Sequence, residues 1–183
     1  MLLTTIPDAL TPILQQGGVI AYPTEAVFGL GCDPRNETAV MRLLCLKQRS
    51  IDKGLILIAA DFSQVANFLL PLNKQQQYYT DPSDTTWIFP AKDSAPQWIT
   101  GQFNSIAVRI TQHPPVQQLC QSFGSALIST SANLSGQPPA KTSQNVIQQF
   151  AQSLDGILDQ QVGSLLKPTE IRDSVNGNII RSS

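Results

Sequence analysis

The sequence has little of what several common functional sites require. Its 183 residues include one histidine and three cysteines. His113 stands directly before two prolines, a setting typical of a surface or turn residue rather than of the oriented histidine in a Ser/His/Asp triad. Cys32, Cys45 and Cys120 form no Cys-x-x-Cys pair, which argues against a disulfide framework or a zinc site. We expect all three thiols to be buried.

Long apolar runs and a strong net charge are also missing. No segment approaches the ~20 apolar residues of a membrane-spanning helix, and the start of the chain lacks a basic stretch followed by an apolar one. The formal net charge is −1, and charged residues make up 14% of the chain, so no long-range attraction to nucleic acid or to an anionic membrane is expected. We therefore expect a cytoplasmic protein with no membrane partner.

The residues that are present, 42% of them hydrophobic, predict a globular mixed α/β sheet. Short apolar runs predict buried strands at 19–22, 55–59, 87–89, 106–110 and 126–128. Helices are expected at 37–47, 61–70, 116–123 and 142–151, with Asn36, Asp61 and Thr142 as N-caps. The stretch 73–84 lacks a pattern and is expected to be a surface excursion. With no internal repeat and no flexible linker, residues 1–183 are expected to form a single domain.

A first candidate site follows the strand expected at 19–22. Pro23 stiffens the turn, and Thr24 and Glu25 then offer a hydroxyl and a carboxylate beside flexible glycines. Since ligand sites in α/β sheets usually lie where strands end, this loop could hold a small polar ligand. A plain turn with a capping threonine explains the same residues equally well.

A second candidate site places three cations, Lys47, Arg49 and Lys53, at the end of a helix and before a strand. Cations there suit the negative end of the helix dipole, and a solvated charged face is one explanation. A polyphosphate clamp is the other, because arginine offers a planar fork and lysine a mobile point charge to phosphate oxygens. The chain has neither a P-loop nor a Gly-x-Gly-x-x-Gly fingerprint, so a phosphate site would have to be built in another way.

A third candidate site follows the strand expected at 126–128. Its hydroxyls and carboxamide could line a pocket for an anion or an amino acid. A cap before a helix is the alternative, but Gly136 and Pro138 would cut such a helix short. The polar residues of this segment are Ser129, Thr130, Ser131, Asn133 and Ser135.

Arg109 lies inside the apolar run expected as a strand at 106–110. A buried, unpaired arginine is very costly, so its side chain must either pair with an acid or face a polar cleft. A structural ion pair and a place in a ligand site are both open explanations.

These segments resemble the short bacterial form of the YrdC/Sua5 family. Each segment alone is a weak signal, but their order along the chain is specific. The matching text is Tyr-Pro-Thr-Glu-Ala-Val-Phe-Gly-Leu-Gly-Cys-Asp (22–33), Lys-Gln-Arg (47–49) with Lys53 and Gly54, Ser-Ile-Ala-Val-Arg (105–109), Ser-Thr-Ser-Ala-Asn-Leu-Ser-Gly (129–136) and Pro-Thr-Glu-Ile-Arg-Asp (168–173).

The resemblance implies an open, twisted mixed sheet with flanking helices and a large concave cavity. It also implies L-threonylcarbamoyladenylate synthase activity, a nucleotidyl transfer in which L-threonine, bicarbonate and ATP give threonylcarbamoyl-AMP and pyrophosphate. Mg²⁺ would enter with ATP. The product would supply the modification of adenosine 37 in transfer RNA through a threonylcarbamoyl transferase complex. Long family members carry an added C-terminal domain, and we expect this chain to lack it.

Carried over by position, the resemblance gives Thr24 a role in binding threonine. Lys47, Arg49 and Lys53 would contact ATP or the amino acid, and we interpret Lys47 and Arg49 as catalytic, because they could stabilise charge on the leaving pyrophosphate. Thr86, Arg109, Ser129, Ser131 and Asn133 would complete the pocket.

The chain also departs from the family pattern at two places. Asp84 adds a carboxylate before the strand at 87–89, and Ser164 with Leu165 stands where a glycine and an arginine are usual, so one cation is expected to be missing. Two rival functions fit the same resemblance: a non-catalytic module that binds double-stranded or transfer RNA, and a carbamoyl-transfer enzyme of hydrogenase maturation. The second normally lies within a much longer chain.

Overall fold

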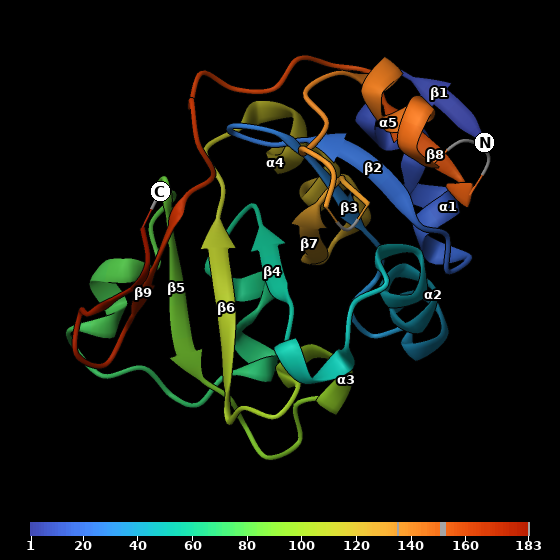
Figure 1. Ribbon diagram of the computed structural model, residues 1–183. Coiled ribbons are helices and arrows are strands. Elements are labelled where there is room, and N and C mark those ends of the chain that lie inside the picture. Colours follow the sequence, from blue (N-terminus) through green and yellow to red (C-terminus); the bar gives the residue numbers. More distant parts are fainter. Residues whose placement is uncertain (135, 151–152, 183) are drawn as a thin grey trace.

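A mixed sheet forms the framework of the protein in a computed structural model that describes residues 1–134, 136–150 and 153–182 (Figure 1). Ten strands are found among those residues. They are β1 (Leu2–Thr4), β2 (Ile20–Pro23), β3 (Phe28–Gly31), β4 (Ile56–Ala59), β5 (Thr85–Pro90), β6 (Ser105–Ile110), β7 (Leu127–Ser131), β8 (Gly156–Leu158), β9 (Glu170–Asp173) and β10 (Ile179–Arg181).

The strand order in the sheet is β1-β8-β2-β3-β7-β4-β6-β5-β9-β10. The pairs β1–β8, β2–β8, β4–β6 and β5–β9 are parallel, and the others are antiparallel. This mixed arrangement confirms the predicted fold class. Each predicted strand is present, at β2, β4, β5, β6 and β7. Strands β1, β3, β8, β9 and β10 were not predicted, because they have only three or four residues each and, in β3, the apolar residues alternate with glycine.

The helices are α1 (Thr11–Gln15), α2 (Glu37–Lys47), α3 (Gln97–Thr100), α4 (Pro114–Phe123) and α5 (Ser143–Phe150). The predicted caps of α2 and α5 are confirmed, because Asn36 Oδ1 accepts the Ala39 N–H at 3.0 Å and Thr142 Oγ1 accepts the Asn145 N–H at 3.1 Å. The predicted last residue of α5, Ala151, lies outside the described residues. None of the helices in the described ranges is both long and apolar enough to cross a bilayer.

Two hydrophobic cores lie on the two faces of the sheet, because neighbouring residues in a strand point to opposite faces. In β4, Leu57 and Ala59 belong to the larger core and Ile58 to the smaller one. The larger core takes the buried residues of α2 and α5, and the smaller core takes those of α4. Strands β2, β4 and β7 are therefore packed on both faces, whereas β6 packs one face on the larger core.

The helix predicted at 61–70 is wrong. The segment forms two short 3₁₀ helices, Phe62–Gln64 and Ala66–Phe68. Asp61 does cap the first of them, since its side chain accepts the Ser63 N–H. The chain cannot continue as an α-helix because Leu69 forms a bridge with Ala91 and the Leu70 N–H donates to the Pro90 carbonyl at 3.0 Å.

The stretch 73–84 lies at the surface as expected, and most of its residues are exposed. Two contacts anchor it: Gln76 is buried and donates to Ser174 Oγ at 3.0 Å, and Tyr79 stacks on Trp87 with ring centroids 3.7 Å apart. One further expectation needs correction. Cys32 and Cys120 are buried as expected, but Cys45 is exposed. Its position in α2 explains this, because the buried stripe of that helix consists of Ala39, Val40, Leu43, Leu44 and Lys47.

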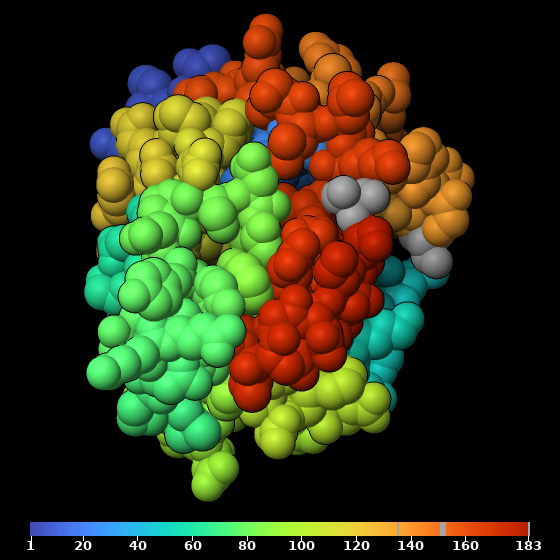
Figure 2. All heavy atoms as spheres, turned by 90° about the vertical axis from the view of Figure 1, so that its left-hand side faces the viewer, coloured from blue at the N-terminus to red at the C-terminus, as the bar shows by residue number. Residues whose placement is uncertain are grey.

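The C-terminal hairpin of β9 and β10 extends the sheet beyond β5. β9 pairs with β5 in parallel, from Thr85 opposite Glu170 to Ile88 opposite Asp173. Figure 2 shows this segment, coloured red, lying over the surface beside the green part of the chain that contains β5. Ile171 of β9 and Ile180 and Arg181 of β10 thereby reach the wall of a cavity.

Candidate active site

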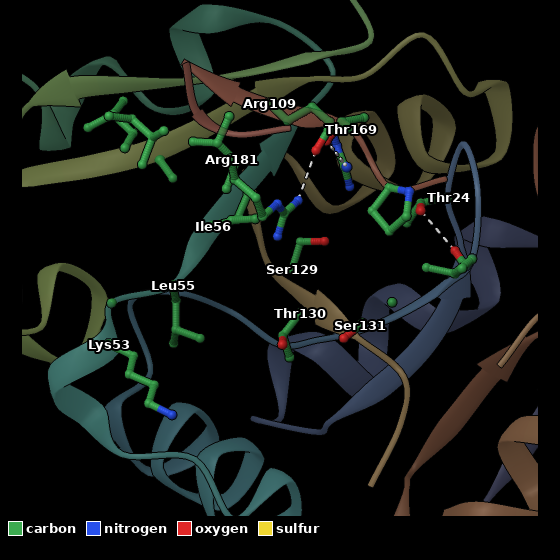
Figure 3. Close-up of a pocket in the computed structure, with 18 of the residues that line it drawn as sticks. Thr24, Lys53, Leu55, Ile56, Arg109, Ser129, Thr130, Ser131, Thr169 and Arg181 are labelled. Carbon is green, nitrogen blue, oxygen red and sulfur yellow. Dashed lines mark hydrogen bonds between the residues drawn. The ribbon is translucent and has the colours of Figure 1, made fainter. Parts of the chain in front are cut away.

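A cavity of about 450 Å³ lies beside the central strands of the sheet. Its walls are the β2–β3 hairpin, strands β4 to β7, the segment before β9, and β10. Figure 3 shows polar side chains from these separate segments turned towards the same space. Ile56, Ile88, Phe103 and Ile180 add apolar surface to the wall. A cavity with apolar walls and a few convergent polar groups is the usual form of a small-molecule site.

Strand geometry explains how β6 contributes to the wall. Ser105, Ala107 and Arg109, at every second position, line the cavity, while Ile106 and Val108 between them belong to the larger core. The same alternation leaves the apolar strand with one basic side chain on its polar face. The expectation that Arg109 is either paired or faces a polar cleft is confirmed, and both conditions hold.

The first candidate loop is a tight β-hairpin rather than an open turn, since β2 and β3 pair directly. Thr24 Oγ1 donates to the Val27 carbonyl at 2.8 Å, and the Thr24 N–H donates to the same oxygen at 2.9 Å. Because the hydroxyl proton is engaged, Thr24 can offer a ligand only the lone pairs of its oxygen. The segment before β9 crosses this loop, with the Gly163 N–H donating to the Thr24 carbonyl at 2.9 Å.

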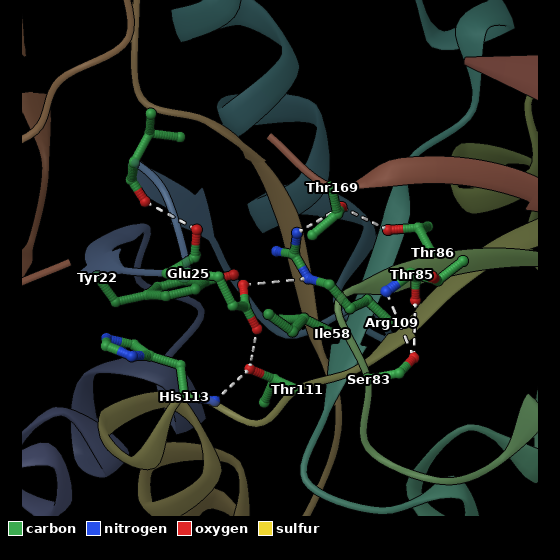
Figure 4. Close-up of polar contacts among 12 residues, drawn as sticks. Tyr22, Glu25, Ile58, Ser83, Thr85, Thr86, Arg109, Thr111, His113 and Thr169 are labelled. Atoms are coloured by element: carbon green, nitrogen blue, oxygen red, sulfur yellow. Dashed lines mark hydrogen bonds and ion pairs between the residues drawn. The ribbon is translucent and has the colours of Figure 1, made fainter. Parts of the chain in front are cut away.

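The carboxylate of Glu25 is not offered to a ligand, which corrects the sequence-based interpretation. One oxygen accepts a hydrogen bond from the Thr111 hydroxyl, and the other lies 3.6 Å from Arg109 Nε. On its other side, Arg109 Nη1 donates to Thr169 Oγ1 at 3.1 Å, and that hydroxyl is 3.0 Å from the hydroxyl of Thr86. Figure 4 shows this chain of contacts running from Thr111 to Thr86.

The second candidate cluster is divided by the end of α2. Gln48 takes a left-handed conformation at φ 48°, and the Arg49 N–H donates to the Leu44 carbonyl at 3.0 Å. This C-terminal cap turns the chain sharply. Arg49 and Lys53 then line the cavity. Arg49 Nη2 donates to the Gly54 carbonyl at 2.9 Å, its Nε is buried without a partner, and burial lowers the pKa of the guanidinium.

Lys47 lies behind the cavity wall instead of in it. Its ammonium donates to the Ser131 carbonyl at 2.6 Å, to the Asn133 carbonyl, and to Asn133 Oδ1 at 3.0 Å. Burial, and then the charge of Arg49, lower the pKa of Lys47 from 10.5 to about 8. Lys47 therefore ties the end of α2 to the turn that follows β7.

Six of the nine residues expected in the site line the cavity, and the other three stand directly behind them. The six are Thr24, Arg49, Lys53, Arg109, Ser129 and Ser131. Lys47 and Asn133 hold each other behind β7, and Thr86 supports Thr169. Ser135, also part of the third cluster, lies outside the described residues.

Thr169 and Arg181 are polar wall residues that were not among the candidate site residues. Thr169 lies within a segment that matched the family pattern, so the pattern could have indicated it, but Arg181 had no sequence signal. Both line the cavity. Arg181 Nη2 donates to the Thr169 carbonyl at 2.8 Å, and burial together with the charge of Arg109 lowers the pKa of Arg181.

Neither departure from the family pattern places a side chain in the cavity wall, although the Leu165 N–H donates to the carbonyl of the wall residue Glu25 at 3.0 Å. Asp84 and Ser164 are exposed and are not part of its wall. The cavity wall contains one cation that the sequence patterns did not indicate, Arg181. His113, expected as a surface or turn residue, is half-buried at the start of α4, with Nε2 3.1 Å from the Gln161 carbonyl, and burial lowers its pKa.

A metal site built from the protein alone is not found in the part of the chain that the structure describes. No group of three or more histidine, cysteine, aspartate or glutamate side chains there could hold an ion. Glu25 is the only carboxylate among the described wall residues, and Thr111 and Arg109 already occupy it. An ion in this cavity would therefore have to bring its other ligands with it.

Comparisons with known proteins agree with this architecture. A threonylcarbamoyl-AMP synthase from Stenotrophomonas maltophilia is 49% identical over 180 residues, covering 96% of this chain and 97% of the relative. One from Enterobacter sp. is 51% identical over 174 residues, covering 92% and 91%. The crystal structure of P. abyssi Sua5 complexed with L-threonine superposes with a TM-score of 0.89 at 23% identity, covering 98% of this chain and 56% of that one. The chain thus spans little more than half of the P. abyssi protein. The Sua5/YciO/YrdC family model, described as telomere recombination, matches residues 12–183, and the chain belongs to this family.

Proposed function

We propose that this protein is a threonylcarbamoyl-AMP synthase, which joins L-threonine, bicarbonate and the adenylyl group of ATP. Relatives carrying that name are about half identical to it over more than nine-tenths of both chains. The observation that carries the proposal is that the β2–β3 hairpin with Thr24 and four cationic side chains, which come from three other segments, share one cavity. The four cations are Arg49, Lys53, Arg109 and Arg181.

The chemistry requires such a cavity. The amine of threonine and bicarbonate form a carbamate with loss of water. A carbamate oxygen then attacks the α-phosphorus of ATP, a new O–P bond forms, and the bond to the β-phosphate breaks as pyrophosphate leaves with the electron pair. Both reactants are anions, so they repel each other unless cations neutralise them. This is a nucleotidyl transfer that needs no nucleophilic side chain.

The wall residues divide naturally into two groups. Arg49 and Lys53 approach from the turn after α2, and neither is ion-paired within the described residues, so we assign them to the phosphates and the pyrophosphate leaving group. Thr24 lies on the opposite hairpin and presents an acceptor to the threonine. Ser129 and Ser131 supply neutral hydroxyls between the two groups without adding charge.

Lys47 would act from behind the wall. Its ammonium fixes the turn at Ser131 and Asn133. It also adds positive charge close to Arg49, one of the residues assigned to the phosphates. Mg²⁺ fits as part of the MgATP substrate, because the phosphates would provide the oxygen ligands that the wall itself lacks. In that role the ion would reduce the charge on the phosphates. Holding threonine near the α-phosphate then supplies the proximity that the reaction requires.

The product is a reactive mixed anhydride, so it must pass quickly to an acceptor. We assign the acceptor to a threonylcarbamoyl transferase complex that modifies transfer RNA, and we place the reaction in the cytoplasm with that RNA. The names of the relatives extend to the activated product, and the transfer step follows from the resemblance to the YrdC/Sua5 family.

The decisive experiment is a pyrophosphate-release assay with purified protein, ATP and bicarbonate. Release should require L-threonine, should be much weaker with serine or glycine, and should stop when bicarbonate is removed. Mass spectrometry should identify threonylcarbamoyl-AMP. Release without an amino acid would show that another acceptor is used. Absence of release, together with RNA binding that weakens steeply with salt, would favour an RNA-binding module instead.

A further inference from the structure

Glu25 and Arg109 form a buried pair whose facing atoms no ligand can reach. Glu25 Oε2 and Arg109 Nε lie 3.6 Å apart, and their side chains are 6% and 9% exposed. Both atoms are buried, and neither makes a hydrogen bond. The carboxylate of Glu25 therefore faces Arg109 and Thr111 rather than a ligand.

The carboxylate is itself fixed from the far side. The Thr111 hydroxyl donates to Glu25 Oε1, and Thr111 Oγ1 accepts the His113 N–H at 3.1 Å. The Thr111 N–H donates to the Ala59 carbonyl at 2.9 Å, which attaches it to the end of β4. Thr111 is completely buried. Glu25 is thus held in place by a residue of the body of the sheet, far from its own hairpin in the sequence.

The guanidinium of Arg109 is oriented at two of its three nitrogens. Nε faces Glu25, and Nη1 donates to Thr169 Oγ1 at 3.1 Å. Nη2 has no protein partner among the described residues, and Figure 3 shows the guanidinium directed into the cavity towards Ser129. An arginine held in this way presents one fixed donor group to a ligand, at little further cost in side-chain entropy.

We propose that Glu25 is a positioning residue, fixed by Thr111, that aims the guanidinium of Arg109 at the α-carboxylate of the amino-acid substrate. The inference rests on the proposed function. Glu25 directly follows Thr24 in the chain, so the Arg109 guanidinium lies at the hairpin end of the cavity. The pair leaves one donor group of Arg109 for a ligand, and Arg49 and Lys53, which form no ion pair among the described residues, remain for the phosphates.

The test uses two substitutions that act on this chain of contacts at different distances. Glu25→Gln removes the charge and keeps the shape of the side chain. Thr111→Val removes only the hydroxyl that fixes Glu25 and leaves both charges of the pair in place. Each should raise the KM for L-threonine, and its Kd in calorimetry without ATP, by about 10- to 100-fold, since misplacement by about 1 Å can cost that much. The KM for ATP should stay unchanged.

Matched controls separate positioning from a general loss of stability. Asp155→Asn breaks the ion pair of Arg42 with Asp155, and Ser143→Ala breaks the 2.6 Å hydrogen bond from Ser143 Oγ to Asp159 Oδ1. Neither Asp155 nor Ser143 lines the cavity. Both changes should lower the melting temperature without changing the KM for threonine. If Glu25→Gln does not fold, Thr111→Val alone decides the question.

The outcomes distinguish this inference from the proposed function. Wild-type protein without threonine-dependent pyrophosphate release would overturn the proposed function. Active wild-type protein with a normal threonine KM in Thr111→Val would overturn the inference alone. A rise in the KM for ATP instead of threonine, or an equal rise in both, would also overturn it, because Arg109 would then serve the phosphates or the fold in general.

Discussion

Lys47 donates hydrogen bonds to both oxygens of Asn133, the backbone carbonyl and Oδ1. A third bond reaches the Ser131 carbonyl at 2.6 Å, and Ser131 Oγ in turn donates to Asn133 Oδ1 at 2.6 Å. All three protons of the ammonium are therefore engaged. Two polar segments more than 80 residues apart in the sequence form one unit, in which the last turn of α2 holds the hydroxyl segment after β7.

Replacing Lys47 with alanine should lower turnover by about 10²-fold or more, the usual effect of removing one preorganised group from an active site. The three bonds would be lost, and the turn carrying Ser131 would no longer be fixed. Pyrophosphate release at saturating ATP and threonine measures the effect. Lys92→Ala is the matched control, because Lys92 also donates to backbone carbonyls, those of Ala66 and Asn67, but lies outside the cavity wall. Equal activity of Lys47→Ala and wild type would refute the role of Lys47.

The activity should fall as the pH rises through about 8. Burial, and then Arg49, lower the pKa of Lys47 to about 8, so the ammonium that holds the turn loses its charge above that pH. A pH profile of kcat should show this decline. A profile that stays flat to about pH 10, where an ordinary lysine titrates, would contradict either the lowered pKa of Lys47 or the need for its charge.

Lys47 should also make the stability depend on pH, in the direction opposite to its effect on activity. Between about pH 8 and 10.5 the unfolded chain binds a proton at Lys47 that the folded chain does not. The free energy of unfolding should therefore rise with pH across this window through the contribution of Lys47. Urea unfolding at both ends of the window, compared between wild type and Lys47→Met, isolates that contribution. The variant should lack the rise.

Sequence patterns predicted those parts of the site that depend on local geometry. Thr24, Ser129 and Ser131 stand at strand ends or on alternate positions of a strand, and Arg109 had to reach a polar cleft because of the apolar strand around it. The side-chain direction of Glu25 was not predictable in this way. It depends on Thr111, which is 86 residues away in the chain and becomes a neighbour only when the sheet forms.

Non-local pairing explains the other errors as well. The segment 61–70 has a helical pattern, but the bridge between Leu69 and Ala91 keeps the end of the segment extended beside the residue that follows β5. Arg181 enters the cavity only because β10 pairs with β9, which pairs in turn with β5. No pattern within a few residues of Arg181 carries that information.

Arg49→Ala should also lower turnover by about 10²-fold, because it removes a partly buried cation from the phosphate end of the cavity. The guanidinium is costly to hold there without an anion, as its lowered pKa and its unpartnered Nε both indicate. ATP should therefore raise the melting temperature of wild type more than that of the variant. Arg35→Ala is the control, since Arg35 pairs with Asp33 at 2.9 Å and is not part of the cavity wall. The same ATP-dependent shift in all three proteins would contradict the assignment.

Arg181→Ala should weaken ATP binding by about tenfold, the scale of one charge-assisted hydrogen bond. Arg181 and Arg109 both line the cavity, and the charge of Arg109 contributes to the lowered pKa of Arg181. Two like charges at such a distance are unfavourable until an anion lies between them. Calorimetry with ATP measures the change. Arg172→Ala provides the control on the same hairpin, because Arg172 pairs with Glu170 at 2.5 Å and is not a wall residue. If both substitutions weaken ATP binding equally, the packing of the hairpin on β5, and not the charge of Arg181, would be responsible.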